Sequence, residues 1–260
     1  MHSRKTAGSS LATRLNKNIG PNDIQIGAWV DSINAGGKYN KNALKAAAHY
    51  PVKVIASSLK YSFYQKKLAL SPESINSAVK LFYARKSKGL LSTHCKAEAA
   101  KSYLSSVWDD YFKFAFIRNP YSQVVSDYYW RRHLCGKPNI TFREFVYRLF
   151  DPARLDIENI RPPIISNWEI YTIKNTIALD FIGCFERLDE DIRKIGDFLG
   201  IKLEDDIVRS KGAIRSKDKT IEQHYDQELI DMVGQIYSNE IKYFGYTPYE
   251  GMPKNHKKLI

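Results

Sequence analysis

The chain has 260 residues, of which 43% are hydrophobic and 13% aromatic, and this is enough to bury one good-sized core. Its formal net charge of +12 favours a polyanionic partner: nucleic acid, anionic lipid, anionic glycan or a phosphorylated cofactor. The three widely spaced cysteines, Cys95, Cys135 and Cys184, argue against a disulfide scaffold and against a zinc site.

The first fifty residues are predicted to contain two helices and one strand. A short helix over 9–18 follows a turn of small residues. Residues 23–29 alternate between apolar and polar side chains, which indicates a strand. The Ala-rich stretch 42–49 favours a second helix, which Pro51 interrupts.

A further helix is predicted to begin at Ser71, the N-cap, and Pro72, the first helical residue, and to end near Gly89. It lies within a basic segment, residues 53–101, that carries ten Lys or Arg against two Glu, a local net charge of +8. A solvated helical face is one interpretation of this charge, and a landing surface for an acidic substrate is the other.

The second half of the chain alternates between strands and helices. Residues 111–117 are nearly all aromatic or aliphatic, as expected for a strand buried on both faces of a parallel sheet. A second strand is expected over 177–185. The alternation indicates an α/β fold with a mainly parallel central sheet flanked by helices. Helices are predicted over 121–134, 142–150, 189–199, which Gly200 closes, and 226–244.

We expect a single domain over residues 1–260, because no Pro-, Gly- or Ser-rich linker divides the chain. No apolar run reaches about 18 residues, so no transmembrane segment is expected in it. No signal peptide opens the sequence, and as given the protein is expected to be cytoplasmic.

The opening segment has the features of a phosphate-cradling turn. The small residues of Lys5-Thr6-Ala7-Gly8-Ser9-Ser10 let backbone N–H groups approach an anion, and the following helix adds a favourable dipole. Lys5 supplies a point charge. The lysine precedes the glycine, so the Walker pattern is not matched. A basic N-terminus with a helix cap at Ser9 or Ser10 is the alternative interpretation.

A second anion site is indicated where the aromatic strand ends. Arg118 follows the strand, and ligands of α/β sheets bind at the carboxyl ends of parallel strands. A guanidinium can hold a phosphate there in bidentate fashion. Ser126 lies eight residues later, in the next helix, where its hydroxyl can face the same anion. The alternative is an ordinary strand–turn–helix with a capping arginine.

Together, the segments KTAGSS (5–10) and FAFIRNPYSQVVSDYYW (114–130) resemble the two signatures of the sulfotransferases that use 3′-phosphoadenosine-5′-phosphosulfate (PAPS). The carbohydrate O-sulfotransferase branch, with forms such as HIPKTAGSS and FVRNPYxRxVSxY, is the most similar. Residues 180–192 resemble its DFIGRFE region, and residues 224–246 its C-terminal YDxE…FGY helix. The resemblance implies a P-loop-like three-layer fold and sulfuryl transfer to a hydroxyl of a carbohydrate or another acceptor, with an anionic acceptor as one alternative.

The resemblance also implies residue roles. The turn Lys5, Thr6, Ala7, Gly8, Ser9 and Ser10 would hold the 5′-phosphosulfate of PAPS. Arg118 and Ser126 would hold its 3′-phosphate, which the product PAP retains. Arg215, Lys217 and Lys219 fall where the family closes a basic loop over the cofactor. Related eukaryotic enzymes are anchored in the Golgi, so a eukaryotic fragment would belong to the Golgi lumen.

His94 is the candidate catalytic base beside Lys5. The segment Ser92 to Ala97 resembles the family's H-x-x-A segment, whose histidine lies near the reacting hydroxyl in some members. A pKa near neutrality suits histidine to take a proton from an attacking alcohol. A surface or packing histidine is the alternative. No carboxylate pair for Mg²⁺ is evident, and no metal is expected.

The sequence departs from the family pattern at its start. Arg4 stands where the family usually has proline, and only four residues precede Lys5. A buried strand comes before this turn in the family. Either the sequence is a fragment or has a misassigned start, or the sheet tolerates a truncated first strand, in which case we expect a weakly anchored turn that binds PAPS poorly.

Three other functions remain open at this point. A P-loop kinase or NTPase would need a lysine after the glycine and an acidic residue at a strand end. A non-catalytic polyanion-binding protein would use the basic segment, although nucleic acid is not the expected partner. An inactive member of the family would keep the fold alone.

Overall fold

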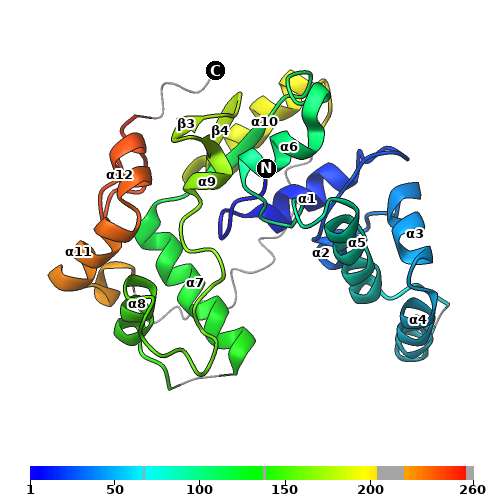
Figure 1. Ribbon diagram of the computed structural model, residues 1–260, viewed down its shortest axis with the longest axis horizontal. Coiled ribbons are helices and arrows are strands. Elements are labelled where there is room, and N and C mark those ends of the chain that lie inside the picture. Colours follow the sequence, from blue (N-terminus) through cyan, green and yellow to red (C-terminus); the bar gives the residue numbers. More distant parts are fainter. Residues whose placement is uncertain (67, 137–138, 204–219, 256–260) are drawn as a thin grey trace.

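A computed structural model describes residues 1–66, 68–136, 139–203 and 220–255, and Figure 1 shows the arrangement of their helices and strands. The helices are α1 (Gly8–Asn16), α2 (Trp29–Asn34), α3 (Lys41–Ala48), α4 (Pro51–Gln65), α5 (Pro72–Lys86), α6 (Ala97–Leu104), α7 (Pro120–Cys135), α8 (Phe142–Phe150), α9 (Trp168–Tyr171), α10 (Leu188–Leu199), α11 (Gln227–Ile236) and α12 (Ser238–Phe244). The strands are β1 (Phe114–Ile117), β2 (Thr172–Ile173), β3 (Thr176–Ile177) and β4 (Phe181–Cys184), and short 3₁₀ turns include η1 (Ser105–Val107), η2 (Phe185–Arg187) and η4 (Glu222–His224).

The centre of the fold is the parallel pair β1 and β4, in which Phe116 lies opposite Gly183. The Phe116 ring lies over β4 at this point. A Cβ atom on Gly183 would lie only 2.5 Å from the ring. The missing side chain therefore lets an aromatic ring cover the backbone of β4. Within the described residues the parallel sheet has two strands, and β2 and β3 form a separate antiparallel pair.

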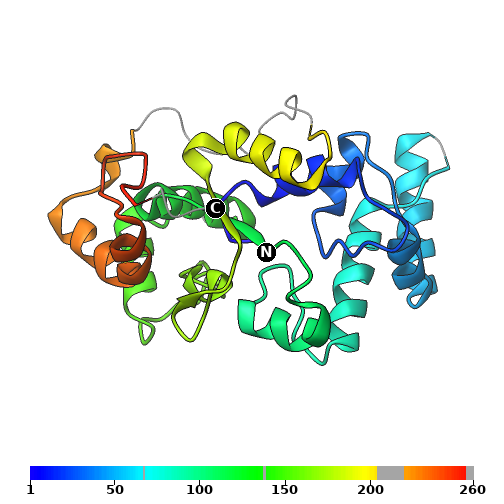
Figure 2. The ribbon, with the colours of Figure 1, turned by 90° about the horizontal axis from the view of Figure 1, so that it is seen from above.

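Helices cover both faces of the strand pair, as Figure 2 shows. Side chains alternate along each strand. Phe116 and Phe181 pack on one face with residues of α1 and α10. Ala115 and Ile182 pack on the other face with residues of α9 and α12. The structure is thus a mixed helix and strand fold with a small parallel sheet, which is compatible with the α/β expectation.

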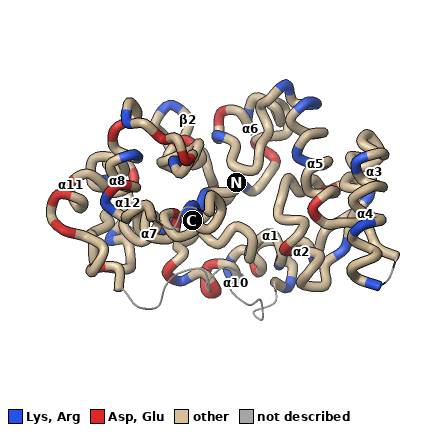
Figure 3. Tube along the Cα trace, turned by 90° about the horizontal axis from the view of Figure 1, so that it is seen from below, with Lys and Arg blue, Asp and Glu red and all other residues tan. Residues whose placement is uncertain are grey.

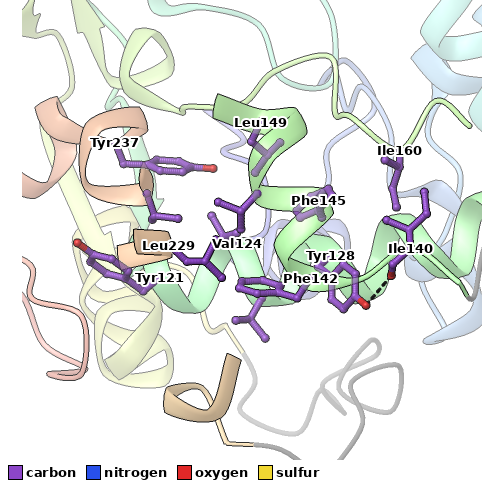
Figure 4. Packing of buried hydrophobic residues seen from close by; sticks show 13 residues of the cluster. Tyr121, Val124, Tyr128, Ile140, Phe142, Phe145, Leu149, Ile160, Leu229 and Tyr237 are labelled. Atoms are coloured by element: carbon purple, nitrogen blue, oxygen red, sulfur yellow. Dashed lines mark hydrogen bonds between the residues drawn. The ribbon is translucent and has the colours of Figure 1, made fainter. Parts of the chain in front are cut away.

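The largest apolar cluster lies beside this sheet, between α7, α8 and α11 (Figure 4). Val124 of α7, Phe145 of α8 and Val233 of α11 are fully buried in it. The Tyr128 hydroxyl donates a hydrogen bond to the Ile140 carbonyl oxygen (2.8 Å), so the cluster also fixes the chain that leads into α8. This core holds the first part of α7, from Tyr121 to Tyr129, in place.

The helices α2 to α5 form a second cluster at the opposite end of the molecule from α11 (Figure 1). Its centre is Trp29 of α2, Ala46 of α3 and Ile75 of α5, which are all inaccessible to solvent or nearly so. Among the described residues, no helix is long and apolar enough to cross a membrane.

Local sequence signals gave several helix boundaries correctly. The Ser71 hydroxyl accepts from the Ser74 N–H at the start of α5, and Pro72 is its first residue. Helix α8 has the predicted bounds, with Thr141 as N-cap. Gly200 adopts a left-handed conformation (φ 65°) at the end of α10.

The strand predicted over residues 23–29 is wrong. Side chains bind the backbone of this segment in place of a neighbouring strand: the Asn40 amide donates to the Asp23 carbonyl oxygen (2.8 Å), and the Trp29 indole to that of Gln25 (3.0 Å). Positive φ angles at Gly27 (107°) and Ala28 (57°) then turn the chain into α2.

Two helix predictions also need correction. Pro51 does not only interrupt a helix but occupies the first turn of α4, a helix that the sequence analysis did not assign. The expected helix over 226–244 is divided into α11 and α12 at Tyr237. The Tyr237 ring is buried and its hydroxyl donates to the Ile165 carbonyl oxygen (3.1 Å), so a tertiary contact accompanies the break.

Candidate functional site

The first residues of the chain run beside β1. The α-amino group of Met1 donates a hydrogen bond to the Phe114 carbonyl oxygen (2.6 Å), and the Ser3 hydroxyl donates to that of Phe116. Residues 1–3 form no regular strand, yet they follow β1 toward its carboxyl end. The turn that begins at Lys5 is therefore brought to the edge of the sheet where the sequence analysis placed the ligand.

Arg4, which replaces the family's usual proline, is a buried anchor for this turn. Asn167 holds its backbone from both sides, because the Asn167 side chain accepts from the Arg4 N–H (2.8 Å) and donates to the Arg4 carbonyl oxygen (3.1 Å). The Arg4 guanidinium donates to both carboxylate oxygens of Asp127 on α7 (2.8 and 3.0 Å). The two side chains are only 9% and 5% exposed, so solvent screens this ion pair little. The expectation of a weakly anchored turn is thus wrong.

The turn itself has a strained backbone. Lys5 (φ 61°) and Ala7 (φ 62°) both adopt the left-handed conformation, which is uncommon for residues other than glycine. Such conformations cluster at ligand-binding sites. Ala7 is the N-cap of α1 and has no side-chain oxygen to accept from the first N–H groups of the helix, which have no partner within it. These N–H groups are the donors that an anion would use.

The other predicted residues of the turn differ in their burial and in their contacts. The Thr6 side chain is buried and lies 3.0 Å from the Ser3 hydroxyl, so it turns inward and leaves only the backbone of Thr6 for a ligand. Ser9 is half-buried, and Ser10 is buried. Gly8 has a steric role, because a Cβ atom there would lie 1.7 Å from the His2 ring.

Arg118 meets the turn at the end of β1. Its Nη1 donates to the Lys5 carbonyl oxygen (3.1 Å), and its Nε donates to the Ser122 hydroxyl (2.9 Å). The guanidinium carbon lies 4.1 Å from the centre of the Phe185 ring, which orients the plane of the group. The structure therefore brings the two sequence motifs, 113 residues apart, into direct contact.

The turn that carries Arg118 is tied to the C-terminal part of the chain. The Asn119 side chain accepts from the Tyr121 N–H and donates to the carbonyl oxygens of Thr247 and Glu250. The Asn119 N–H donates to the carboxylate of Glu186 (2.7 Å), and burial raises the pKa of that carboxyl. Sequence analysis missed Glu186, Asn119 and Phe185. The family-like segment 180–192, which contains two of them, was the available signal.

Ser126 lies on α7, four residues after the Ser122 that contacts Arg118, and residues four apart share one face of a helix. Its side chain is half-buried. Asp127, the partner of Arg4, is the next residue, so α7 carries both a candidate ligand contact and the anchor of the opening turn. Arg215, Lys217 and Lys219 lie outside the described residues.

His94 lies beside the same turn. Its Nδ1 is 2.8 Å from the His2 carbonyl oxygen, which can only accept, so Nδ1 carries the hydrogen and Nε2 the lone pair in the neutral ring. The pKa of His94 is lowered from 6.5, mainly by burial, with smaller contributions from the charges of Arg4 and Lys80. The ring is therefore neutral at pH 7, with a basic Nε2.

His2 is a second residue that sequence analysis missed. Its ring centre lies 4.5 Å from that of His94, and its ring packs against Gly8. The family form HIPKTAGSS begins with histidine at this position, so the signal was present in the sequence.

A cavity of about 290 Å³ is lined by His2 and by Thr93 and Cys95, the chain neighbours of His94. It lies between α1, the loop before α2, the loop before α6 and β1, and most of its lining is apolar. The Lys5 ammonium lies 5.1 Å from the centre of the Trp130 ring on α7. The residues that line the cavity include His2, Gly8, Leu11, Ile26, Thr93 and Cys95.

Comparison with known proteins adds three findings. A family model described as "Sulfotransferase family" matches residues 4–247. A protein of Archaeoglobus fulgidus described as "Uncharacterized protein" is 33% identical over 101 residues, which cover 39% of this chain and 78% of that protein. No solved structure matches the chain.

Proposed function

Because the chain belongs to the sulfotransferase family, whose members transfer sulfuryl groups, we propose that it moves this group from PAPS to a hydroxyl of a carbohydrate. The observation that carries the proposal is the 3.1 Å contact between Arg118 Nη1 and the Lys5 carbonyl oxygen. PAPS has an anionic group at each of two positions of its ribose. A cradling turn and a guanidinium in contact match such a ligand, whereas a nucleotide with one anionic group would need only one of them.

The residues at the site fit PAPS in charge and in the type of hydrogen-bond donor. Lys5 and the first N–H groups of α1 would hold the 5′-phosphosulfate. Arg118 and Ser126 would hold the 3′-phosphate, and Arg118 is already oriented by its stacking on Phe185. Arg215 and Lys217 remain proposed contacts from the loop over the cofactor.

When bound, PAPS supplies a sulfuryl group activated by its bond to phosphate. Lys5 and the adjoining N–H groups stabilise negative charge on the departing phosphate, and one such donor contributes roughly 3–4 kcal/mol. His94 accepts the acceptor's hydroxyl proton at Nε2, since its Nδ1 is committed to the His2 carbonyl oxygen. The Arg4–Asp127 ion pair holds the turn against α7, so Lys5 and Arg118 keep their positions relative to each other.

Two features support a carbohydrate acceptor, as in the carbohydrate O-sulfotransferase branch. Trp130 offers an aromatic surface beside Lys5, on which the apolar face of a sugar ring can stack. Lys80 belongs to the basic segment 53–101, and its charge reaches His94, so an acidic sugar would be attracted to the base.

The proposal includes the fold as a whole. We propose a single P-loop-like domain of three layers, because helices cover both faces of β1 and β4 and the candidate site lies at the carboxyl end of β1.

Calorimetric titration with PAP and with AMP tests the proposal. We expect PAP to bind the protein more tightly, and Arg118→Ala to remove the difference, because AMP lacks the 3′-phosphate. Arg154→Ala, which alters an exposed arginine that pairs with Glu144, is the matched control and should behave as wild type. Equal affinity of the wild-type protein for PAP and AMP would rule out the assignment of Arg118.

Assays with ATP and with polyanions separate the rival functions. A kinase or NTPase would bind ATP with Mg²⁺ and hydrolyse it. A polyanion-binding protein would show strongly salt-dependent binding of DNA or heparin without affinity for PAP.

A further inference from the structure

Helix α4 carries an exposed apolar stripe. Val52, Ile55, Leu59 and Phe63 are 82%, 59%, 64% and 81% exposed. Their spacing of three and four residues places them on one face of the helix. Scattered exposed apolar residues are normal, but an aligned row of four on one helix marks an interaction surface.

The opposite face fixes α4 to the rest of the protein. Val54 is buried in the cluster with α3 and α5, and Ser58 is also buried. The Ser58 hydroxyl accepts from the Ser71 N–H (3.0 Å) at the N-terminus of α5. The helix is thus held by one face while the stripe on the other faces outward. In Figure 1, α4 lies at the end of the molecule opposite α11.

The chain around the stripe is basic up to Glu73, at the start of α5. Residues 32–72 contain seven lysines and no aspartate or glutamate. Figure 3 shows lysines along α3 and α4. Lys53 and Lys60 are exposed on α4 itself and border the stripe, and Tyr64 and Leu68 add exposed apolar surface at its C-terminal end.

We propose that α4 docks on the surface of an anionic lipid bilayer, with the stripe in the boundary between headgroups and acyl chains and the lysines on the headgroups. An amphipathic helix with lysine on the polar face and Phe or Leu on the other has this behaviour. Anionic headgroups attract such basic segments.

The other binding partners considered match either the lysines or the apolar stripe, but not both. A second copy of the chain would bring Lys53 and Lys60 of one stripe against the same lysines of the other, and like charges repel. A nucleic acid or an acidic glycan would match the lysines but would leave Leu59 and Phe63 in water. A bilayer with anionic headgroups matches both the charge and the apolar row.

Co-sedimentation of the full chain with vesicles tests the proposal. We expect binding to vesicles of phosphatidylcholine with phosphatidylserine, and little binding to phosphatidylcholine alone. The double variant Leu59→Ser and Phe63→Ser should lose binding by about tenfold or more, because it removes the central apolar contacts. Lys53→Gln with Lys60→Gln should weaken binding only to the anionic vesicles.

Leu155→Ser with Ile157→Ser is the matched control. These two side chains are 71% and 74% exposed but lie outside α4, so the variant should bind vesicles as the wild type does. Affinity for PAP should be unchanged in every variant, which keeps this test separate from the proposed function.

Three results would overturn the proposal. One is equal vesicle binding by the wild type and the Leu59/Phe63 variant. Another is equal binding to neutral and anionic vesicles. The third is a wild-type dimer in analytical ultracentrifugation that becomes monomeric in the Leu59/Phe63 variant, which would assign the stripe to a second copy.

Discussion

Two turns meet at the carboxyl end of β1, and they are built in opposite ways. The turn before α1 has two residues with positive φ, Lys5 and Ala7, and its N-cap has no side chain to accept from the helix. The turn before α7 is closed by Asn119, whose side chain caps the helix and also binds two carbonyl oxygens of the C-terminal segment. The first turn presents the N-terminus of α1 without a side-chain cap, and the second fixes a single side chain, Arg118.

The difference shows how one site can combine a turn that binds an anion through its backbone with a single arginine held in a fixed position. The side-chain contacts that anchor the first turn lie at Arg4, just before the residues proposed to bind the anion. A guanidinium binds a phosphate in one orientation more readily when the backbone that carries it is fixed. The contacts that anchor Arg118 therefore lie on its own turn, at Asn119.

Removing the charge from either turn should have the largest effect. We expect Lys5→Ala and Arg118→Ala each to lower the rate of sulfuryl transfer by roughly a thousandfold, because each removes a donor to an anionic group. The fold should survive, as circular dichroism would show. Wild-type-like turnover by either variant would contradict the assignment of that residue.

Removing the anchor of the first turn should have the next largest effect. Asp127→Ala leaves the Arg4 guanidinium buried without its partner, and loss of one member of a buried ion pair costs about 3 kcal/mol or more of unfolding free energy. Chemical denaturation measures this change. Asp231→Ala, at an exposed position of α11, is the control and should change stability by less than about 0.5 kcal/mol. An equal loss in both variants would show that the pair does not anchor the turn.

Removing the candidate base should affect turnover more than binding. We expect His94→Ala to lower turnover by about a hundredfold with little loss of PAP affinity. Because the pKa of His94 is lowered from 6.5, the base is neutral at pH 7, and wild-type turnover should fall only as the pH drops below 6.5. This acid limb should be absent from the variant's pH profile.

His49 provides the control for that experiment. Its Nδ1 also lies 2.8 Å from a carbonyl oxygen, that of Lys45, but it is exposed at the end of α3. His49→Ala should leave both the turnover and the acid limb intact. An equal loss of turnover and PAP affinity in His94→Ala would identify a structural histidine instead.

Removing the cap of the second turn should have the smallest effect. Asn119→Ala should lower the unfolding free energy by about 1–2 kcal/mol, because α7 loses its N-cap. It should also weaken PAP binding, because the turn that carries Arg118 is no longer fixed. Thr141→Ala removes the equivalent cap from α8 and should cost about 1 kcal/mol without a change in PAP affinity. If both variants kept full affinity, the rigidity of the second turn would have no role in binding.

The sequence predicted those parts of the fold whose signals are local. Ser71 with Pro72 at a helix start and Gly200 at a helix end act within a few residues, so their elements were predicted well. The segment 23–29 has the alternation of a strand, but side chains from elsewhere, such as Asn40, bind its backbone. Alternation alone does not supply a partner strand.

The site was predictable only in part for the same reason. Lys5 and Arg118 could be named because each stands in a recognisable motif. Their anchors could not, since Asp127 is 123 residues from Arg4 and Asn167 is 163 residues from it. Contacts over such separations depend on the packed fold, which composition and spacing do not specify.

The position of Cys95 in the cavity wall offers a practical handle on this protein. Burial raises the pKa of the Cys184 thiol to about 12, so that group stays protonated and inert toward alkylating dyes. Once Cys135 is replaced by serine, Cys95 becomes the single half-buried thiol for labelling. A fluorophore attached there would sit next to the candidate base and would report, in real time, the arrival of donor or acceptor without any assay of turnover.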